Sequence, residues 1–319
     1  MNPAPKGRFA PSPSGRMHLG NALCGLLAWL SVRSRGGRMV LRMEDLDPQR
    51  CKPQYAGQLI EDLRWLGLDW DEGPGAAQPD APYWQSQCGG LYQEALQTIA
   101  RRAQVYPCYC TRADLHAASA PHLSDGTVLY SGRCRALTDE QRAARQAEGR
   151  APALRVAVPE ETVAFVDGHL GPFEQDLARQ CGDFILRRSD GVYAYQLAVV
   201  VDDGRMGVTE VVRGQDLLPS TPRQIWLQRL LGLPQPQYRH IPLLVNREGV
   251  RLSKREKSLD LGALRQRFSP AQLRGELAAL AGLLEAPRAV ELEELLEVFS
   301  WEKVPVCPVP VPERLTALE

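Results

Sequence analysis

Two short segments of the chain carry residues suited to binding phosphate. Residues 14–21 read Ser-Gly-Arg-Met-His-Leu-Gly-Asn, at an expected junction between a strand and a helix. Glycines let the backbone approach a phosphate there, and a helix N-terminus offers free N–H groups, so His18 would lie where it can hydrogen-bond a phosphate. Residues 251–257 read Arg-Leu-Ser-Lys-Arg-Glu-Lys and hold two of the chain's five lysines, compact charges that suit phosphate oxygens. Either segment alone could be a solvated loop, but the two segments together, in this order, indicate a phosphate-binding site much more specifically.

Three cysteines form a second group of chemically informative residues. Cys108, Cys110 and Cys134 lie within 27 residues, and the first two have C-x-C spacing. Thiolates at such spacing suit a metal with tetrahedral coordination, which favours zinc. On ligand chemistry alone the fourth ligand would be His116 or His122, although three buried or idle thiols would give the same spacing. A site with four protein ligands would be structural, because it leaves no open position for catalysis.

These groups need a framework, and the first part of the chain predicts one. Residues 7–10 are a short strand candidate, and a helical pattern covers 18–33 after the Gly-rich segment. An apolar run of β type at 39–42 then precedes an amphipathic helix at 56–66. Strand, helix, strand and helix in this order predict an α/β fold with a parallel sheet.

The rest of the chain predicts an insertion and a tail. Turn-rich segments predict an insertion that carries the cysteines, after which strands return at 183–187 and 194–201 and a helix covers 221–231. The last part is rich in Leu, Ala and Glu, which predicts a short helical region. We therefore expect four regions: the first half of the catalytic domain at 1–105, the insertion at 106–184, the second half at 185–268 and the helical tail at 269–319.

Composition narrows the class of protein. The chain has 319 residues, 44% hydrophobic and 24% charged, with 38 basic and 38 acidic side chains, which is ordinary globular composition. The longest strongly apolar stretch, 22–30, is far shorter than the ~20 residues of a membrane span. The N-terminus has no basic-then-apolar signal pattern, so we expect a soluble, monomeric, cytoplasmic protein with reduced cysteines.

The two phosphate-binding segments resemble the signatures of the class I aminoacyl-tRNA synthetases. Residues 18–21 (HLGN) are similar to the signature HIGH, and residues 251–255 (RLSKR) are similar to the signature KMSKS. Other segments are similar to the glutamyl branch of this family: residues 8–15 (RFAPSPSG), 42–47 (RMEDLD), 195–203 (YQLAVVVDD) and 207–214 (GVTEVVRG). The resemblance covers residues 7–268 and implies an ATP-dependent ligase that activates L-glutamate as an adenylate. It also implies a Rossmann-like parallel sheet that binds ATP at the carboxyl ends of its strands.

The resemblance also implies which residues bind the substrates. His18 and Lys254 would be the catalytic residues, with Mg²⁺ accompanying ATP, and the ATP-binding residues would be His18, Gly20, Asn21, Ser253 and Lys254. The glutamate-binding residues would be Arg8, Phe9, Ala10, Pro11, Ser12, Glu44, Tyr195 and Arg213. Glu44 is the natural partner of the ammonium group and Arg213 that of the γ-carboxylate, although Glu44 could instead cap a helix and Arg213 could form a structural ion pair.

Two departures from full-length glutamyl enzymes narrow the implied acceptor. Only about fifty residues follow residue 268, where the resemblance ends, too few for the helical anticodon-binding region of those enzymes. The pattern of Cys108, Cys110, Tyr130 and Cys134 matches the zinc site of a shorter group in the same branch, which favours Tyr130 as the fourth ligand. That group attaches glutamate to the queuosine base in the anticodon of tRNA(Asp), so the implied partner is queuosine-modified tRNA(Asp).

Other functions remain open on the sequence. A truncated glutamyl-tRNA synthetase would charge a tRNA 3′ end, and a non-catalytic paralogue would bind tRNA without activating glutamate. A nucleotidylyltransferase would share the His-x-Gly segment but not the glutamyl-type segments. The insertion also carries arginines that fit contact with RNA phosphates, or a solvated surface almost as well: Arg133, Arg135, Arg142, Arg145, Arg150 and Arg155.

Overall fold

The central sheet of the protein has four parallel strands. The computed structural model describes residues 4–76, 82–111, 129–149, 151–250 and 259–316. The strands are ordered β2-β1-β8-β9 and comprise, in that order, Arg38–Leu41, Lys6–Phe9, Glu210–Gly214 and Gln237–Ile241. All three strand pairs are parallel, so the carboxyl ends of the four strands meet at one edge. The predicted α/β class with a parallel sheet is confirmed.

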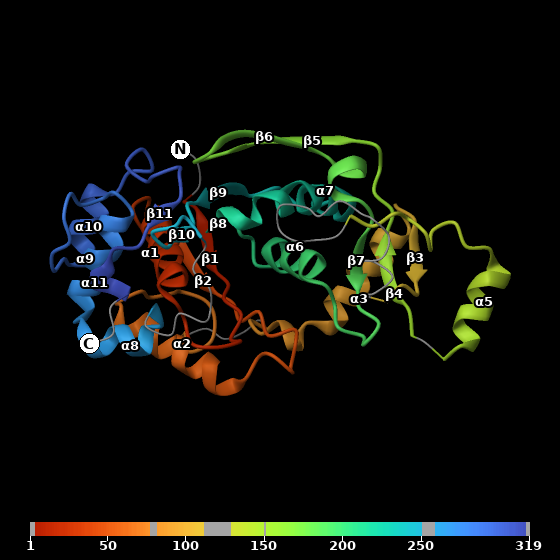
Figure 1. Ribbon diagram of the computed structural model, residues 1–319, viewed down its shortest axis with the longest axis horizontal. Helices are drawn as coiled ribbons and strands as arrows, with labels where there is room; N and C mark the ends of the chain where they lie inside the picture. The colour runs from red at the N-terminus through yellow and green to blue at the C-terminus, as the bar shows by residue number, and fades with distance from the viewer. Residues whose placement is uncertain (1–3, 77–81, 112–128, 150, 251–258, 317–319) are drawn as a thin grey trace.

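Helix α1 (Leu19–Arg33) connects β1 to β2 and confirms the helix expected at 18–33. Its side chains are buried on nearly all sides, among them Leu23, Leu27 and Leu30, which is typical of a helix at the centre of a protein. A Cβ atom at Gly7 would lie 2.4 Å from Val32 Cγ2, so α1 packs directly against the backbone of β1. This close packing fixes the N-terminus of α1 beside the carboxyl end of β1 (Figure 1).

Two further helices precede the insertion. Helix α2 (Pro53–Trp65) buries Ala56, Leu59 and Leu63, which are spaced as in an amphipathic helix. After a 3₁₀ turn at Gln85–Gln87, helix α3 (Gly89–Ala100) leads away from the sheet toward the insertion (Figure 1). Helix α2 lies close to the helix expected at 56–66.

The strand expected at 194–201 is wrong, because these residues belong to helix α6 (Tyr195–Arg205). The apolar run Leu197–Val201 contains three valines, which favour strands, and it has no polar residue that would reveal a helical period. Helix α6 packs between α3 and α7 (Thr221–Leu231), which buries Leu197, Ala198, Val199 and Val200 together. Burial on several sides therefore removed the pattern that distinguishes a helix from a strand.

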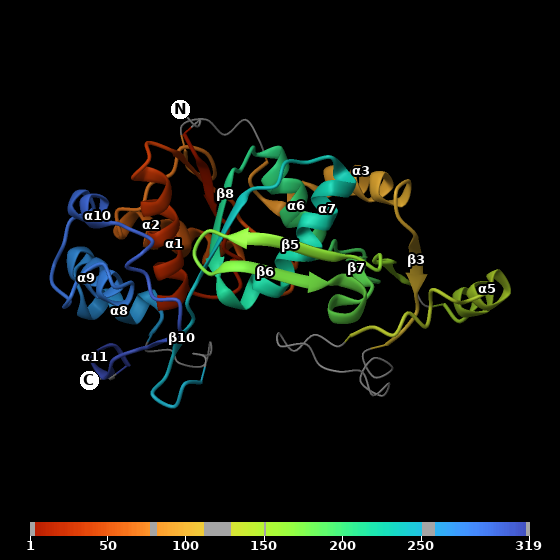
Figure 2. The ribbon, with the colours of Figure 1, turned by 90° about the horizontal axis from the view of Figure 1, so that it is seen from above.

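The insertion is built from antiparallel strands. Strands β3 (Val105–Cys108), β4 (Ala153–Val156) and β7 (Phe184–Arg187) form a sheet in that order. Strands β5 (Thr162–Asp167) and β6 (Gly171–Asp176) form a separate hairpin, whose turn reaches back over the central sheet (Figures 1 and 2). Helix α5 (Asp139–Ala147) lies at the far end of the molecule, and a π-helix at Leu177–Cys181 leads into β7.

The C-terminal part is helical only in part. Its helices are α8 (Leu261–Arg267), α9 (Pro270–Leu280), α10 (Leu292–Val298) and α11 (Glu313–Thr316). Between the last two, β11 (Val309–Pro310) pairs in parallel with β10 (Leu244–Val245), so the tail returns to the sheet domain instead of ending as a separate helical unit. A 3₁₀ turn at Gln215–Ser220 joins β8 to α7. Among all the helices of the described residues, none has both the length and the apolar character to cross a membrane.

Candidate active site

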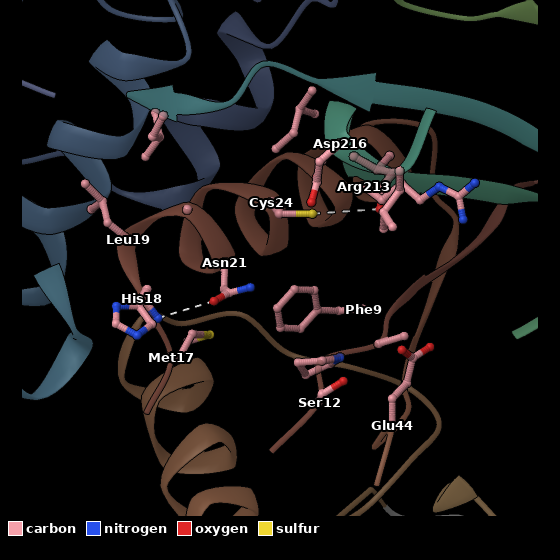
Figure 3. Close-up of a pocket in the computed structure, with 18 of the residues that line it drawn as sticks. Phe9, Ser12, Met17, His18, Leu19, Asn21, Cys24, Glu44, Arg213 and Asp216 are labelled. Atoms are coloured by element: carbon pink, nitrogen blue, oxygen red, sulfur yellow. Dashed lines mark hydrogen bonds between the residues drawn. The ribbon is translucent and has the colours of Figure 1, made fainter. Parts of the chain in front are cut away.

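A cavity of about 520 Å³ lies at the carboxyl ends of β1, β8 and β9. Its lining includes all eight residues that the resemblance assigns to glutamate: Arg8, Phe9, Ala10, Pro11, Ser12, Glu44, Tyr195 and Arg213. Of the expected ATP-binding residues, His18, Gly20 and Asn21 also line it. Figure 3 shows His18 at one end of the cavity, and Glu44 and Arg213 at the other. The fold thus brings four distant segments to one cavity.

The N-terminus of α1 forms the His18 end of the cavity. The His18 backbone N–H donates to Asn21 Oδ1 at 3.4 Å, so Asn21 stabilises the first turn of the helix. The residues after the second basic segment lie beside the start of α1. The Leu261 N–H donates to the Met17 carbonyl at 2.8 Å, and the backbones of His18 and Asp260 form an isolated antiparallel β-bridge. The expected ligands Ser253 and Lys254 lie outside the described residues.

Arg42 organises the charges at the opposite end. Its buried guanidinium donates to Asp203 Oδ1 at 2.6 Å and to Glu44 Oε1 at 3.1 Å. Burial lowers the pKa of Arg42, but the carboxylates of Asp203 and Glu44 more than offset this and raise it, so the cation is permanent. Arg8 is held in the same network, with Nε 3.7 Å from Asp203 and Nη1 donating to the Val212 carbonyl at 2.9 Å.

The backbone around Glu44 is fixed relative to the loop after β1. The Glu44 N–H donates to the Pro11 carbonyl, and the Arg42 N–H donates to the Phe9 carbonyl, both at 3.0 Å. Burial raises the pKa of Glu44, and the nearby guanidiniums of Arg42 and Arg8 oppose that rise. Burial also raises the pKa of Tyr195, so its hydroxyl stays protonated and can donate into the cavity.

Arg213 is held by three side chains, two from α7 and one from β9. Its Nε–H donates to His240 Nε2 at 3.0 Å, Nη1 to Gln224 Oε1 at 2.7 Å and Nη2 to Thr221 Oγ1 at 2.8 Å. Among the described residues, three of its five N–H groups are engaged in this way, and one remains on each terminal nitrogen. Two parallel N–H groups can bind a carboxylate in a bidentate fork.

Several residues of this site had no role in the sequence analysis. Asp202 and Asp203 directly follow an apolar run in the segment 195–203. Two acidic residues at such a place could have indicated carboxylates that pair with a buried cation. Cys24 also lines the cavity, and burial raises the pKa of its thiol to about 11, so it stays a thiol at neutral pH. Nothing local in the sequence marks Gln224 or His240 as partners of an arginine.

The three clustered cysteines come together in the insertion. The sulfur atoms of Cys108, Cys110 and Cys134 lie within 4.8 Å of one another. Tyr130 Oη is 3.6 Å from Cys108 Sγ and 3.9 Å from Cys110 Sγ, so an oxygen lies beside the three sulfurs. A tetrahedral zinc site with Zn–S bonds of about 2.3 Å places its sulfurs about 3.8 Å apart, close to the 3.5 Å between Cys110 and Cys134. The donor set fits zinc; His116 and His122 lie outside the described residues.

One of the arginines expected to contact RNA is not on the surface. Arg155 is buried, donates to the Asp183 carbonyl at 2.8 Å, and lies 4.0 Å from the centre of the Tyr130 ring. It therefore supports the cysteine cluster, and the expectation that it contacts RNA is wrong. Arg142 and Arg145 are partly exposed on α5 but pair with Asp139 and Glu148 of the same region.

Comparison with known proteins identifies similar chains across the whole length. A family model described as tRNA synthetases class I (E and Q), catalytic domain, matches residues 6–273. The glutamyl-Q tRNA(Asp) synthetase of Symbiobacterium thermophilum is 52% identical over 316 residues, which cover 98% of each chain. Glutamate–tRNA ligase 2 of Alkalilimnicola ehrlichii is 48% identical over 265 residues, or 82% of this chain and 55% of that protein.

The fold is also found in a solved structure. The crystal structure of a glutamate tRNA ligase from Elizabethkingia meningosepticum, in complex with its amino acid, aligns with a TM-score of 0.83. The two sequences are 26% identical, and the alignment covers 98% of this chain and 68% of that one.

Proposed function

Because the chain belongs to the class I tRNA synthetases of the E and Q family, and so is a ligase, we propose that it transfers glutamate to the queuosine base of tRNA(Asp). The first step would be attack of the glutamate α-carboxylate on the α-phosphate of ATP, which forms glutamyl-adenylate and expels pyrophosphate. This carboxylate is already ionised at pH 7, so the step needs no general base. The protein would act by positioning the substrates and stabilising charge.

One observation carries the proposal: the cavity joins a phosphate-binding helix end to a pocket with the charges that glutamate needs. Glutamate has two carboxylates and one ammonium group. Arg8 and Arg213 supply two guanidiniums, and Glu44 supplies a carboxylate at the same end; Asp216 also lines the cavity. Arg213 would hold the γ-carboxylate, Glu44 the ammonium group, and Arg8 with the backbone of residues 10–12 the amino-acid end.

The other end of the cavity suits ATP. His18 and the N–H groups at the start of α1, with Gly20 and Asn21, would bind phosphate oxygens, and the helix dipole favours their negative charge. Lys254 and Ser253 would complete the phosphate site, and Lys254 would neutralise pyrophosphate as it leaves. Mg²⁺, which class I synthetases use with ATP, would supply further charge neutralisation.

The acceptor is proposed from similarity. The Symbiobacterium relative is named glutamyl-Q tRNA(Asp) synthetase, and the similarity covers nearly the full length of both chains. The similarity to a glutamate–tRNA ligase favours a second candidate, in which the enzyme charges a tRNA 3′ end. The two candidates share the same adenylate chemistry and differ only in the nucleophile that receives glutamate.

A labelling experiment distinguishes the two candidates. The protein is incubated with ATP, Mg²⁺, labelled glutamate and tRNA(Asp) that either carries or lacks queuosine, and the product is digested with nuclease. We expect label on the anticodon fragment, and only with queuosine present. Label on the 3′-terminal adenosine would instead identify a tRNA-charging enzyme. Adenylate formation without transfer to either site would contradict both acceptors, and absence of adenylate would contradict the ligase step itself.

For the cysteine cluster we propose a structural zinc ion held by Cys108, Cys110, Tyr130 and Cys134. Bound there, zinc would cross-link β3 to the loop before α5 and would do no chemistry on the substrates. We expect the purified protein to contain about one zinc per chain by inductively coupled plasma mass spectrometry. Cys134→Ala should lose most of this zinc, because three remaining donors bind it far more weakly.

Cys307→Ala is the matched control, because Cys307 is exposed in the C-terminal tail, outside the cluster. This variant should keep the zinc content of the unaltered protein. Equal zinc content in both variants would contradict the proposed ligand set, and a metal-free protein with a stable insertion would contradict the metal site.

A further inference from the structure

The β5–β6 hairpin of the insertion brings a carboxylate to the central sheet. Figures 1 and 2 show the hairpin extending back from the insertion, with its turn beside β8 and β9. Asp167 stands at the end of β5 and is buried. Its Oδ1 accepts the backbone N–H groups of His169 and Leu170, at 3.0 and 2.9 Å, and that of His240 at 3.2 Å. These bonds fix both the turn and the carboxylate.

The second oxygen of Asp167 fixes the protonation of His240. Asp167 Oδ2 lies 2.6 Å from His240 Nδ1, and a carboxylate can only accept, so Nδ1 carries a proton. Burial lowers the pKa of His240 to about 4, because it outweighs the hydrogen bond to Asp167. The imidazole is therefore neutral, and Nε2 is left as an acceptor.

Arg213 uses that acceptor. Its Nε–H donates to His240 Nε2 at 3.0 Å, on neighbouring strands where Arg213 and His240 face each other in register. The reversed tautomer would point an N–H at the Arg213 N–H, and a protonated ring would add a second positive charge beside it. Only the tautomer that Asp167 selects is compatible with the observed orientation of Arg213.

We propose that Asp167 and His240 are positioning residues that orient the Arg213 guanidinium for the γ-carboxylate of glutamate. The proposal rests on the proposed function, in which Arg213 binds that group. With Nε–H bound to His240, Arg213 presents the two terminal N–H groups that remain, one on each Nη. The insertion therefore contributes to amino-acid recognition in the central domain through one hydrogen-bonded relay, although neither Asp167 nor His240 lines the cavity.

The variant Asp167→Asn tests the relay by reversing the tautomer. The Asn Oδ1 atom can still accept the three backbone N–H groups, so its amide NH₂ must face His240 Nδ1. That NH₂ donates, so Nδ1 must accept and the proton moves to Nε2, opposite the Arg213 N–H. We expect KM for glutamate in ATP–pyrophosphate exchange to rise about 10- to 100-fold, the usual effect of losing a hydrogen bond to a charged group. KM for ATP should stay unchanged.

A second substitution separates positioning from simple destabilisation. His240→Leu removes the ring and with it the acceptor for the Arg213 Nε–H, so it should raise KM for glutamate about as much as Asp167→Asn does. Adding Asp167→Asn to His240→Leu should then have little further effect on KM, because no ring is left for Asp167 to orient. An effect of Asp167→Asn that did not act through His240 would persist in both backgrounds, so the two effects are distinguishable in a double-mutant cycle.

Asp176→Asn is the matched control, because it makes the same change at the other end of the hairpin, where Asp176 caps the Arg179 N–H at 2.9 Å. It should leave KM for glutamate unchanged. An unchanged KM in Asp167→Asn, or an equal rise in both His240 backgrounds, would overturn the relay. Absence of glutamate-dependent exchange in the unaltered protein would overturn the proposed function instead.

Discussion

Replacing Arg213 by glutamine should lower kcat/KM for L-glutamate on the order of 100- to 1,000-fold. Arg213 is buried at the end of the cavity that we propose for glutamate, and without it the γ-carboxylate would lose its counter-charge in a partly dehydrated pocket. Loss of one member of such a charge pair costs about 3–4 kcal/mol, which corresponds to this factor. The measurement is the rate of glutamate-dependent ATP–pyrophosphate exchange as a function of glutamate concentration.

Arg239→Gln is the control for this substitution. Arg239 lies on the adjacent strand, next to Val212 in register, but it pairs with Glu210 and stacks on Trp301, away from the cavity. It should change KM for glutamate little. If Arg213→Gln retained normal kcat/KM, Arg213 would be a structural arginine and the γ-carboxylate would bind elsewhere.

Replacing Arg42 by methionine should lower the free energy of unfolding by about 3–5 kcal/mol. Arg42 is fully buried and compensates the carboxylates of Glu44, Asp202 and Asp203, at 3.1, 3.9 and 2.6 Å. Methionine fills a similar volume but leaves these negative charges together in a poorly hydrated interior. Equilibrium denaturation in urea measures the change, and glutamate binding should weaken as well, because Arg42 orients Glu44.

The loss should depend on pH in a defined direction. Burial already raises the pKa of Glu44, and removing the opposing guanidinium would raise it further above its unfolded value. A carboxyl group with a raised folded-state pKa destabilises the fold as pH rises through that pKa. The difference in stability between the variant and the unaltered protein should therefore shrink as pH falls from 8 toward 5.

Arg38→Met is the control for Arg42→Met. Arg38 is the first residue of β2, which ends just before Arg42, but its side chain is 59% exposed and Glu72 lies 3.5 Å away. Exposed ion pairs contribute about 0–1 kcal/mol, so this change should be small and nearly independent of pH. Equal losses from the two substitutions would mean that the buried charge of Arg42 contributes no more to stability than an exposed ion pair.

Local patterns along the chain determined the fold class, the family and the candidate binding segments. The alternation of short strands and helices predicted the parallel sheet, because apolar spacing reports secondary structure directly. The loop after β1, Glu44 and the start of α1 could be assigned from motifs, since each is a contiguous segment with its own residue pattern. The prediction of a strand at 194–201 was wrong because it too relied on apolar spacing. A helix that is buried on several sides lacks the spacing that marks an amphipathic helix.

Only the tertiary structure decided the charge partners around these segments. Asp203 reaches Arg42 across 161 positions and Asp167 reaches His240 across 73, and neither separation is marked by any local signal. Likewise, the sequence does not distinguish a surface position of Arg155 from its actual burial against the Tyr130 ring. A buried charge needs a partner, but which residue becomes that partner depends on how distant elements pack. The sequence by itself determined which groups could bind glutamate and ATP, whereas the packing of the hairpin and of α6 decided how those groups are held.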